Sequence, residues 1–172
     1  MTDKGDITLQ ALQLTQLKEF MSHLLTQETF DAFCLCEGSI TTFTEFEITG
    51  AYYPDYYELE QDLYPPDYLT WKQVRPLVFQ IVKGKHTPRQ FKLVFRLADY
   101  NVEKFLLQSN ISTVKASDLA GLYLNLYYNG KTLTCTTGSS FRIFSLDRSV
   151  DQAWDQMVQK FLKQKSIAFE KM

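Results

Sequence analysis

The amino-acid sequence predicts an α+β domain in which helices pack on one mainly antiparallel sheet. Apolar residues recur at helical spacing near both ends of the chain, and segments between them alternate between apolar and polar residues. These alternating segments come in pairs joined by turn-forming residues, which is typical of β-hairpins. The length of 172 residues suits a single domain over residues 1–172.

The first unit of the chain is predicted as a strand, a helix and a hairpin. Residues 8–14 alternate as a strand does, and a helix capped by Thr15 is expected to run to about Thr26. Its apolar face consists of Leu17, Phe20, Met21, Leu24 and Leu25. Two β-rich segments follow, "FDAFCLCE" and "ITTFTEFEIT", and the residues Gly38 and Ser39 between them predict a tight turn.

Residues 51–69 form an irregular, acidic and tyrosine-rich connection. They hold three of the five prolines and six of the ten tyrosines. Tyrosine offers a large contact area at a low entropic cost, so this composition favours a partner-binding surface. Its tyrosines are Tyr52, Tyr53, Tyr56, Tyr57, Tyr64 and Tyr68. The alternative is that they cover the core.

Pro76 decides how the next segment is interpreted. Thr70 is predicted to cap a short helix that Pro76 ends, because proline removes a helical hydrogen bond. The segments "LVFQIVK" and "RQFKLVFRLA" then form a hairpin around "GKHTP", with alternate side chains of 90–97 facing the core. The alternative is a helix that continues to Val82, which fits the spacing of Trp71, Val74, Val78 and Ile81.

The last part of the chain repeats the pattern of the first. Asp99 is expected to cap a helix through 100–108, and "GLYLNLYYNGKTLTCTTG" predicts a hairpin with a type I′ turn at Asn129 and Gly130. The segment "SSFRIFSL" extends that hairpin or follows it as a strand, and Ser149 opens the closing helix. The echoes "LKEFM" with "VEKFL" and "TTFT" with "KTLT" predict a duplication of about 8–50 in about 89–146.

Charge is divided sharply along the chain. From Glu19 to Trp71 there are eleven acids and no lysine or arginine, whereas from Tyr68 to Ala98 there are seven bases and no acid. This asymmetry permits a basic surface that binds anions or a nucleic-acid backbone. Its candidate residues are Lys83, Lys85, His86, Arg89, Lys92 and Arg96. The alternatives are that these charges keep a hairpin tip soluble, or that they pair with the acidic segment.

Several functional classes find no support in the sequence. Nucleophile, P-loop, dinucleotide and zinc-protease motifs are missing, so catalysis is not expected, and neither is a cofactor. Cys34, Cys36 and Cys135 lack zinc-site spacing and are expected to be buried thiols rather than metal ligands. No apolar run suits a membrane span and the acidic start is unlike a secretory signal, so we expect a cytoplasmic protein without a membrane partner.

Two resemblances add to these predictions. The segments "SITTFTEFEI", "VRPLVFQIVKGKHTP" and "LTCTTGSSFRIFSLDRSVDQAWDQMV" resemble a bacterial family, mainly from Firmicutes, known as a domain of unknown function. That resemblance covers about Leu9 to Leu162, implies an intracellular single-domain protein and supplies no catalytic residue. The architecture is similar to half-domains of sliding DNA clamps and to the saddle of the TATA-box-binding protein. The polar faces of the two matching helices depart from the clamp pattern, because they mix acids and bases.

Two hypotheses follow from these observations. The first is a non-enzymatic intracellular protein-interaction module that acts through the acidic tyrosine-rich connection and binds an unknown protein or a second copy of itself. The alternative is a nucleic-acid-associated protein with a clamp-like or saddle-like fold that uses the basic hairpin. The two differ in salt dependence, because nucleic-acid binding weakens steeply as salt rises.

Overall fold

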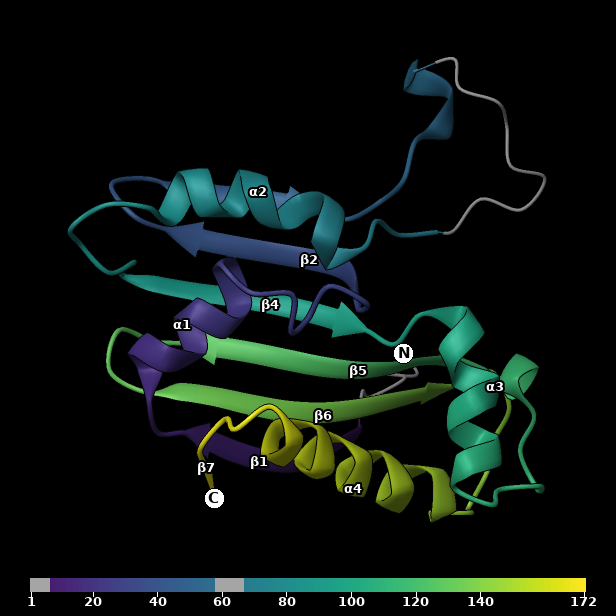
Figure 1. Cartoon of the computed structure of the whole chain (residues 1–172). Coiled ribbons are helices and arrows are strands. Elements are labelled where there is room, and N and C mark those ends of the chain that lie inside the picture. Colours follow the sequence, from purple (N-terminus) through teal and green to yellow (C-terminus); the bar gives the residue numbers. More distant parts are fainter. Residues whose placement is uncertain (1–6, 58–66) are drawn as a thin grey trace, which may run out of the picture.

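The computed structural model describes residues 7–57 and 67–172, which form a seven-stranded sheet with helices against it (Figure 1). The strand order is β3-β2-β4-β5-β6-β1-β7, and every neighbouring pair is antiparallel. The predicted α+β class is therefore confirmed. The elements are β1 (Ile7–Leu14), α1 (Leu17–Leu25), β2 (Cys34–Thr41), β3 (Glu45–Thr49), the 3₁₀ helix η1 (Pro54–Tyr57), α2 (Trp71–Val82), β4 (Gln90–Arg96), α3 (Asp99–Gln108), the 3₁₀ helix η2 (Ala116–Asp118), β5 (Leu119–Tyr128), β6 (Leu133–Phe141), α4 (Ser149–Gln164) and β7 (Phe169–Lys171).

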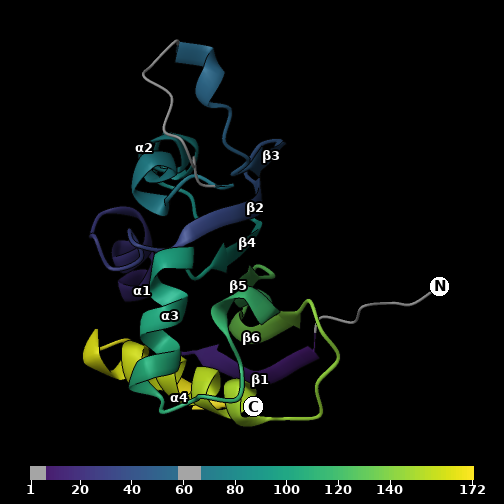
Figure 2. The same ribbon diagram turned by 90° about the vertical axis from the view of Figure 1, so that its right-hand side faces the viewer.

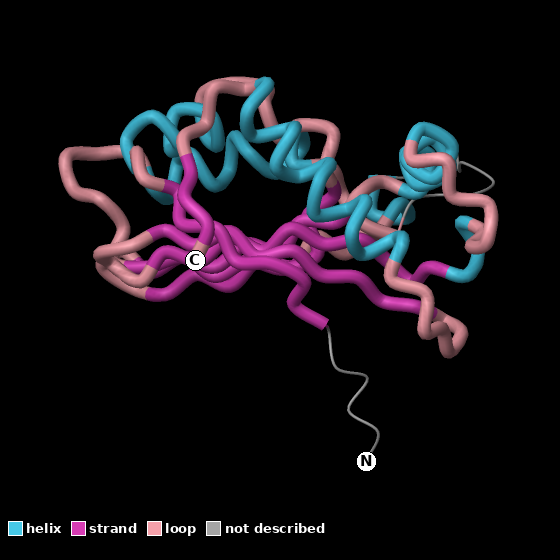
Figure 3. The backbone as a smooth tube through the Cα atoms, turned by 90° about the horizontal axis from the view of Figure 1, so that it is seen from below, coloured by secondary structure: helices cyan, strands magenta, loops and turns pink. Residues whose placement is uncertain are grey.

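The helices α1 to α4 lie on one face of the sheet, as Figure 3 shows along the sheet edge. The core fills the space between these two layers. Alternate residues of each strand point into it, as predicted for β4, where Phe91, Leu93 and Phe95 are buried. The helices contribute Phe20, Trp71, Trp154 and other large apolar side chains to the same core. No helix of the described residues is long and apolar enough to cross a bilayer.

The helix α2 overturns the prediction that Pro76 ends a helix. It runs unbroken from Trp71 to Val82, so the predicted basic hairpin does not form, and 83–89 is instead a loop between α2 and β4. Pro76 and Lys72 are both exposed, so water can hydrate the Lys72 carbonyl that loses its helical partner. Burial of the α2 apolar face, at about 1.5–3 kcal/mol for each large side chain, outweighs a proline cost of about 3 kcal/mol.

The first predicted hairpin exists, but its turn lies elsewhere. Strand β2 continues through Gly38 and Ser39, and the chain reverses at 42–44, where the Thr42 amide donates to the Thr44 carbonyl at 2.9 Å. The tight turn at Gly38 is thus wrong. A Cβ atom at Gly38 would lie 2.8 Å from Leu93 Cδ2, so glycine here permits close packing between β2 and β4.

The β5–β6 hairpin is confirmed, with a wider turn than predicted. Tyr128 pairs with Leu133, so the connection has four residues, and only Gly130 has a positive φ, of 94°, whereas a type I′ turn needs two such residues. The Asn129 side-chain oxygen accepts hydrogen bonds from the Lys131 and Thr132 amides. Beyond it, β6 ends at Phe141, so the strand predicted for "SSFRIFSL" is only partly formed.

The predicted cap Thr70 of α2 is confirmed, whereas the other three helices start one residue away from their predicted caps. The cap positions are Gln16, Ala98 and Arg148, next to the predicted Thr15, Asp99 and Ser149. Shifts of one residue are common at helix ends. The predicted duplication stays a prediction: β1-α1-β2-β3 and β4-α3-β5-β6 share their element order, but β4 lies beside β5, whereas β1 lies beside β6.

Candidate binding face

The face of the sheet that points away from the four helices is the candidate site, and we call it the open face. The strand register places on it the residues that alternate with the core: Glu37 and Ser39 of β2, Lys92 and Val94 of β4, Tyr123, Asn125 and Tyr127 of β5, and Thr136 of β6. Antiparallel pairing aligns them in rows across the sheet, because directly paired residues point to the same side. One row runs from Glu37 through Val94 and Asn125 to Thr136.

Two adjoining hollows lie on the open face. One, of about 520 Å³, is lined by β3, β2 and β4, and includes Glu47, Ser39 and Thr49. The other, of about 410 Å³, is lined mainly by β4, β5 and β6, and includes Asn125 and Tyr127. Both are bordered by Glu37 and Lys92, so they adjoin at this ion pair, and we call the two together the depression. Its size is in the range of ligand sites, and its lining mixes carboxylate, amide, hydroxyl and tyrosine groups.

The charge of this depression is more acidic than basic. Glu37 and Glu47 line it with a single lysine, Lys92, whose Nζ lies 3.7 Å from Glu37 Oε1. Both partners of that pair are exposed, so water screens it and it contributes little to stability. The depression therefore suits a cationic group better than an anion. Lys92, predicted as an anion ligand, lies here among carboxylates.

Arg96 does not extend a basic surface, which corrects its predicted role. It shares the open side of β4 with Lys92, but it is only 7% exposed. Its guanidinium donates to Asp99 Oδ1 at 3.0 Å and to the Ala120 carbonyl at 2.9 Å, and it lies 5.8 Å from the centre of the Tyr68 ring. Strand alternation correctly predicted which side of the sheet Arg96 lies on. It could not predict that Tyr68 and Asp99, at the start of α3, cover it.

The remaining predicted anion ligands share one loop. Lys83, Lys85, His86 and Arg89 are all exposed in the loop between α2 and β4. The turn with Lys131 lies beside this loop, because a Cβ atom at Gly130 would be 2.9 Å from the Arg89 carbonyl. This basic loop stands at one end of the sheet and not along a ribbon.

The predicted tyrosine surface is divided between exposed and half-buried groups. Tyr53 and Tyr56 are exposed beside and within η1, whereas Tyr52 is half-buried and Tyr68 lies against Arg96. Tyr64 and the Tyr57 side chain lie outside the described residues. Tyr53 and Tyr56 are therefore the tyrosines that the described part of this connection exposes.

The three cysteines carry protonated thiols. Cys34 and Cys135 are buried as predicted, whereas Cys36 is half-buried and borders the hollow of about 410 Å³. Desolvation raises the pKa of Cys36 to about 11, although Arg96 opposes the shift, and burial raises the pKa of Cys135 to about 12. Such thiols are poor nucleophiles at neutral pH. Across residues 7–57 and 67–172, no group of three or more potential metal-ligating side chains comes together.

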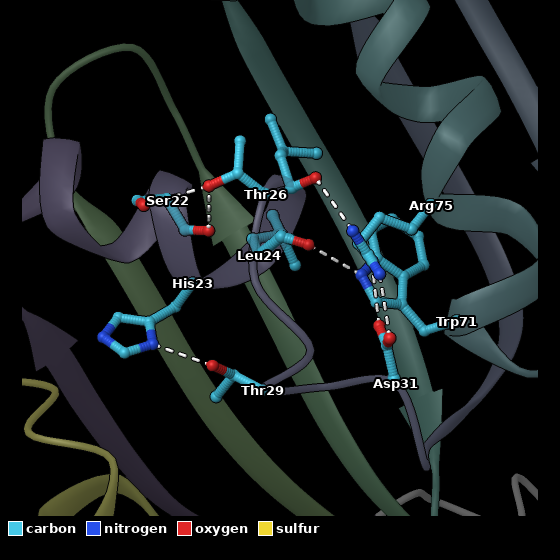
Figure 4. Close-up of polar contacts among 9 residues, drawn as sticks. Ser22, His23, Leu24, Thr26, Thr29, Asp31, Trp71 and Arg75 are labelled. Atoms are coloured by element: carbon cyan, nitrogen blue, oxygen red, sulfur yellow. Dashed lines mark hydrogen bonds and ion pairs between the residues drawn. The ribbon is translucent and has the colours of Figure 1, made fainter.

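Arg75 and His23 serve the fold and not the open face. Figure 4 shows them in a network of polar contacts among α1, α2 and the loop 26–33 that follows α1. Arg75 binds both carboxylate oxygens of Asp31 at 2.9 Å, and this partly buried pair raises the pKa of the Arg75 guanidinium. The Trp71 indole donates to the Leu24 carbonyl at 2.8 Å, while His23 Nδ1 lies 2.8 Å from Thr29 Oγ1. Two of the seven bases therefore pair with the acidic segment, Arg75 with Asp31 and Lys92 with Glu37, as the alternative interpretation of the charges had it.

Sequence reasoning missed most of the open face. Glu37, Glu47 and Asn125 were not candidates, although alternation within 119–128 already separated Tyr123, Asn125 and Tyr127 from the core leucines. That signal tells which residues share a side. It cannot tell whether helices cover that side, because this depends on where all four helices pack.

Comparison with known proteins identifies a family but no function. A family model described as a family of unknown function, DUF5721, matches residues 23–170. Among curated proteins and solved structures, none matches the chain. The likeness to DNA clamps therefore stays a prediction. Since the family model covers most of the sequence, the chain belongs to the DUF5721 family.

Proposed function

We propose that this chain is a non-enzymatic protein-interaction module that binds its partner across the open face of the sheet. The observation that carries the proposal is the depression on that face, lined by Glu37, Glu47, Asn125 and Tyr127. A broad surface of hydrogen-bonding groups and tyrosines suits a polypeptide better than a small apolar ligand. Burial raises the pKa of the Cys36 thiol, so this residue of the depression does not resemble a cysteine nucleophile.

The chemistry of the depression specifies the partner class. Two carboxylates against one lysine attract a cationic segment, and the amide and hydroxyl of Asn125 and Thr136 can bind an extended backbone. Tyr127, the register partner of Lys92 on β5, adds an exposed ring beside it. The partner is thus an extended peptide segment that carries arginine or lysine.

A display library of random twelve-residue peptides tests this proposal. The wild-type chain is expected to enrich peptides with arginine or lysine, and Glu37→Lys with Glu47→Lys is expected to reverse that preference toward acidic peptides. The matched control changes the same charge on the helix layer, with Glu19→Lys and Glu103→Lys, both exposed. Enrichment that is the same in the open-face variant and in the wild type would rule the open face out.

A second candidate function rests on the basic loop. Lys83, Lys85 and Arg89 are exposed together beside the turn with Lys131, an arrangement that favours contact with a phosphate backbone. Binding of mixed single- and double-stranded DNA and RNA should then weaken steeply between 50 and 200 mM salt, and Lys85→Glu with Arg89→Glu should reduce the slope by about two. An absence of binding at low salt would eliminate this candidate.

A further inference from the structure

The segment 142–148, between β6 and α4, displays apolar side chains that the fold does not use, and we call it the apolar tip. Phe144 is 89% exposed, Leu146 83% and Ile143 49%, although all three stand within four residues of one another. Three large exposed apolar groups within one short segment make it a candidate interaction site, because contiguous exposed apolar surface often marks one.

Hydrogen bonds hold both ends of the apolar tip to the rest of the fold. The Arg142 amide donates to the Asp118 carbonyl at 2.8 Å, and Asp147 accepts the Thr113 hydroxyl at 2.8 Å and the Ser149 amide at 2.9 Å. A segment tied at both ends loses less conformational freedom when it binds, so its apolar groups are suited to act as anchors.

The apolar tip and the open face belong to the same side of the molecule. In Figure 2 the segment after β6, drawn yellow-green, swings out on the side of the sheet away from the helices before it turns into α4. The hollow of about 410 Å³ reaches Gly138 of β6, three residues before that strand ends at Phe141. A partner lying over the depression therefore needs only a short extension to reach the apolar tip.

We propose that the apolar tip is the second half of the same binding surface, so that the partner is a polypeptide segment with a cation at one end and an apolar anchor at the other. This inference rests on the proposed function. The cation lies over Glu37 and Glu47, because the two ends of the apolar tip carry arginines: Arg142 is exposed and would repel a cation there, and Arg148 is exposed and already pairs with Asp151. The apolar anchor lies against Phe144 and Leu146.

The strand register sets the spacing within such a partner. Glu37 is three strand steps from Thr136, which is roughly 14 Å, and Thr136 is five residues from Phe141, which is roughly 17 Å along β6. The diagonal of these two distances is roughly 22 Å, the length of about six or seven extended residues. That length reaches only Phe141, at the base of the apolar tip, so the cation and the apolar anchor of the partner are separated by about six or more residues.

The same peptide library distinguishes this inference from the proposed function. Wild-type selection should return peptides with a basic residue and an aromatic or aliphatic residue about six or more positions apart. Phe144→Ser with Leu146→Ser should abolish the apolar preference, retain the basic one and weaken a selected peptide by about tenfold or more. The matched control is Phe43→Ser, which removes a phenylalanine that is 92% exposed on the β2–β3 turn.

Each outcome has a defined meaning. If the tip variant selects the same peptides as the wild type, the inference fails while the proposed function stands. If Glu37→Lys with Glu47→Lys also leaves the selected peptides unchanged, both fail. Phe144→Trp gives an independent readout, because Trp71 and Trp154 are fully buried, and its emission should shift to the blue when a selected peptide binds. A shift with vesicles of phosphatidylcholine and phosphatidylglycerol, and none with peptide, would overturn the inference in favour of a lipid contact.

Discussion

On the helix side of the sheet, the hydroxyls of Ser139 and Thr137 each donate a hydrogen bond of 2.7 Å to a carboxylate of α4, whereas on the open side Asn125 and Thr136 line a hollow. Thr136 and Thr137 are adjacent residues of β6, and Asn125 pairs with Thr136 from β5. The comparison teaches that alternation sorts side chains into two classes, and that the helix layer then decides which polar groups are committed to the fold. Groups on the open side remain available to a partner, and the predictions below test that division.

The largest expected difference is between adjacent residues of β5. Leu124→Ala should lower the free energy of unfolding by about 2–5 kcal/mol, because Leu124 is fully buried and its loss leaves a cavity. Asn125→Ala, on the open face, should change it by about 0.5 kcal/mol or less. Urea denaturation monitored by circular dichroism measures both. Similar losses for the two variants would mean that the open face is part of the core.

The next effect concerns the buried polar contact between β6 and α4. Asp151→Ala should lower the free energy of unfolding by about 1–3 kcal/mol, because the buried Ser139 hydroxyl loses its acceptor. Asp151→Asn keeps an acceptor oxygen, so it should lower the free energy of unfolding by less. Thermal and urea unfolding report the difference. If Glu47→Ala on the open face proved as costly as Asp151→Ala, the two faces would not differ in this respect.

Two ion pairs sharpen the comparison further. A double-mutant cycle for Arg75 and Asp31 should give a coupling energy of about 1–2 kcal/mol, because the pair is bidentate and partly buried. The Lys92 and Glu37 pair, at 3.7 Å and exposed, should give less than about 0.5 kcal/mol. Equal coupling energies would contradict the view that the open-face charges serve a partner more than the fold.

The smallest effect is a pH dependence confined to the helix side. Desolvation by burial, with a smaller contribution from Asp151, raises the pKa of Asp155, although the Thr137 hydrogen bond opposes this. The folded state therefore holds this proton more tightly than the unfolded chain, whose aspartate pKa is about 3.9. The contribution of Asp155 to stability is largest below that value and falls as pH rises through the raised pKa.

Asp155→Asn provides the measurement. The difference in free energy of unfolding between the wild type and this variant should change between pH 3 and pH 7, with the wild type losing stability relative to the variant as pH rises. A parallel pair of curves would show that the Asp155 pKa is the same in the folded and unfolded chains. Glu47→Gln, on the open face, is the control for exposed carboxylates.

Much of the secondary structure was predictable from local pattern. The stripe of apolar residues in α1 and the alternation in β4 and β5 specify which side chains the core receives, since helical and strand periodicities differ. Membership in a family of unknown function was also predicted correctly, whereas its bacterial origin stays a prediction. The candidate site was predicted only in fragments, because its residues come from β2 to β6 and meet only in the folded sheet.

Prolines, glycines and charges were predicted less well, for a common reason. Pro76 was expected to end a helix, Gly38 to make a turn and Arg96 to face water, and each expectation used an intrinsic preference of the residue. In the fold, Pro76 lies on the exposed side of α2, Gly38 lies beneath Leu93, and Arg96 is covered by Tyr68 and Asp99. Tertiary contacts outweighed the preferences in all three places.

The sequence by itself determined the α+β class, the strand periodicity and the separation of acids from bases along the chain, because these depend on neighbouring residues. Only the tertiary structure decided that the four helices pack on one face, that the other face holds a depression, and that Phe144 and Leu146 stand beyond its edge. Those features depend on contacts between residues far apart in the chain, whose free energy no local pattern contains.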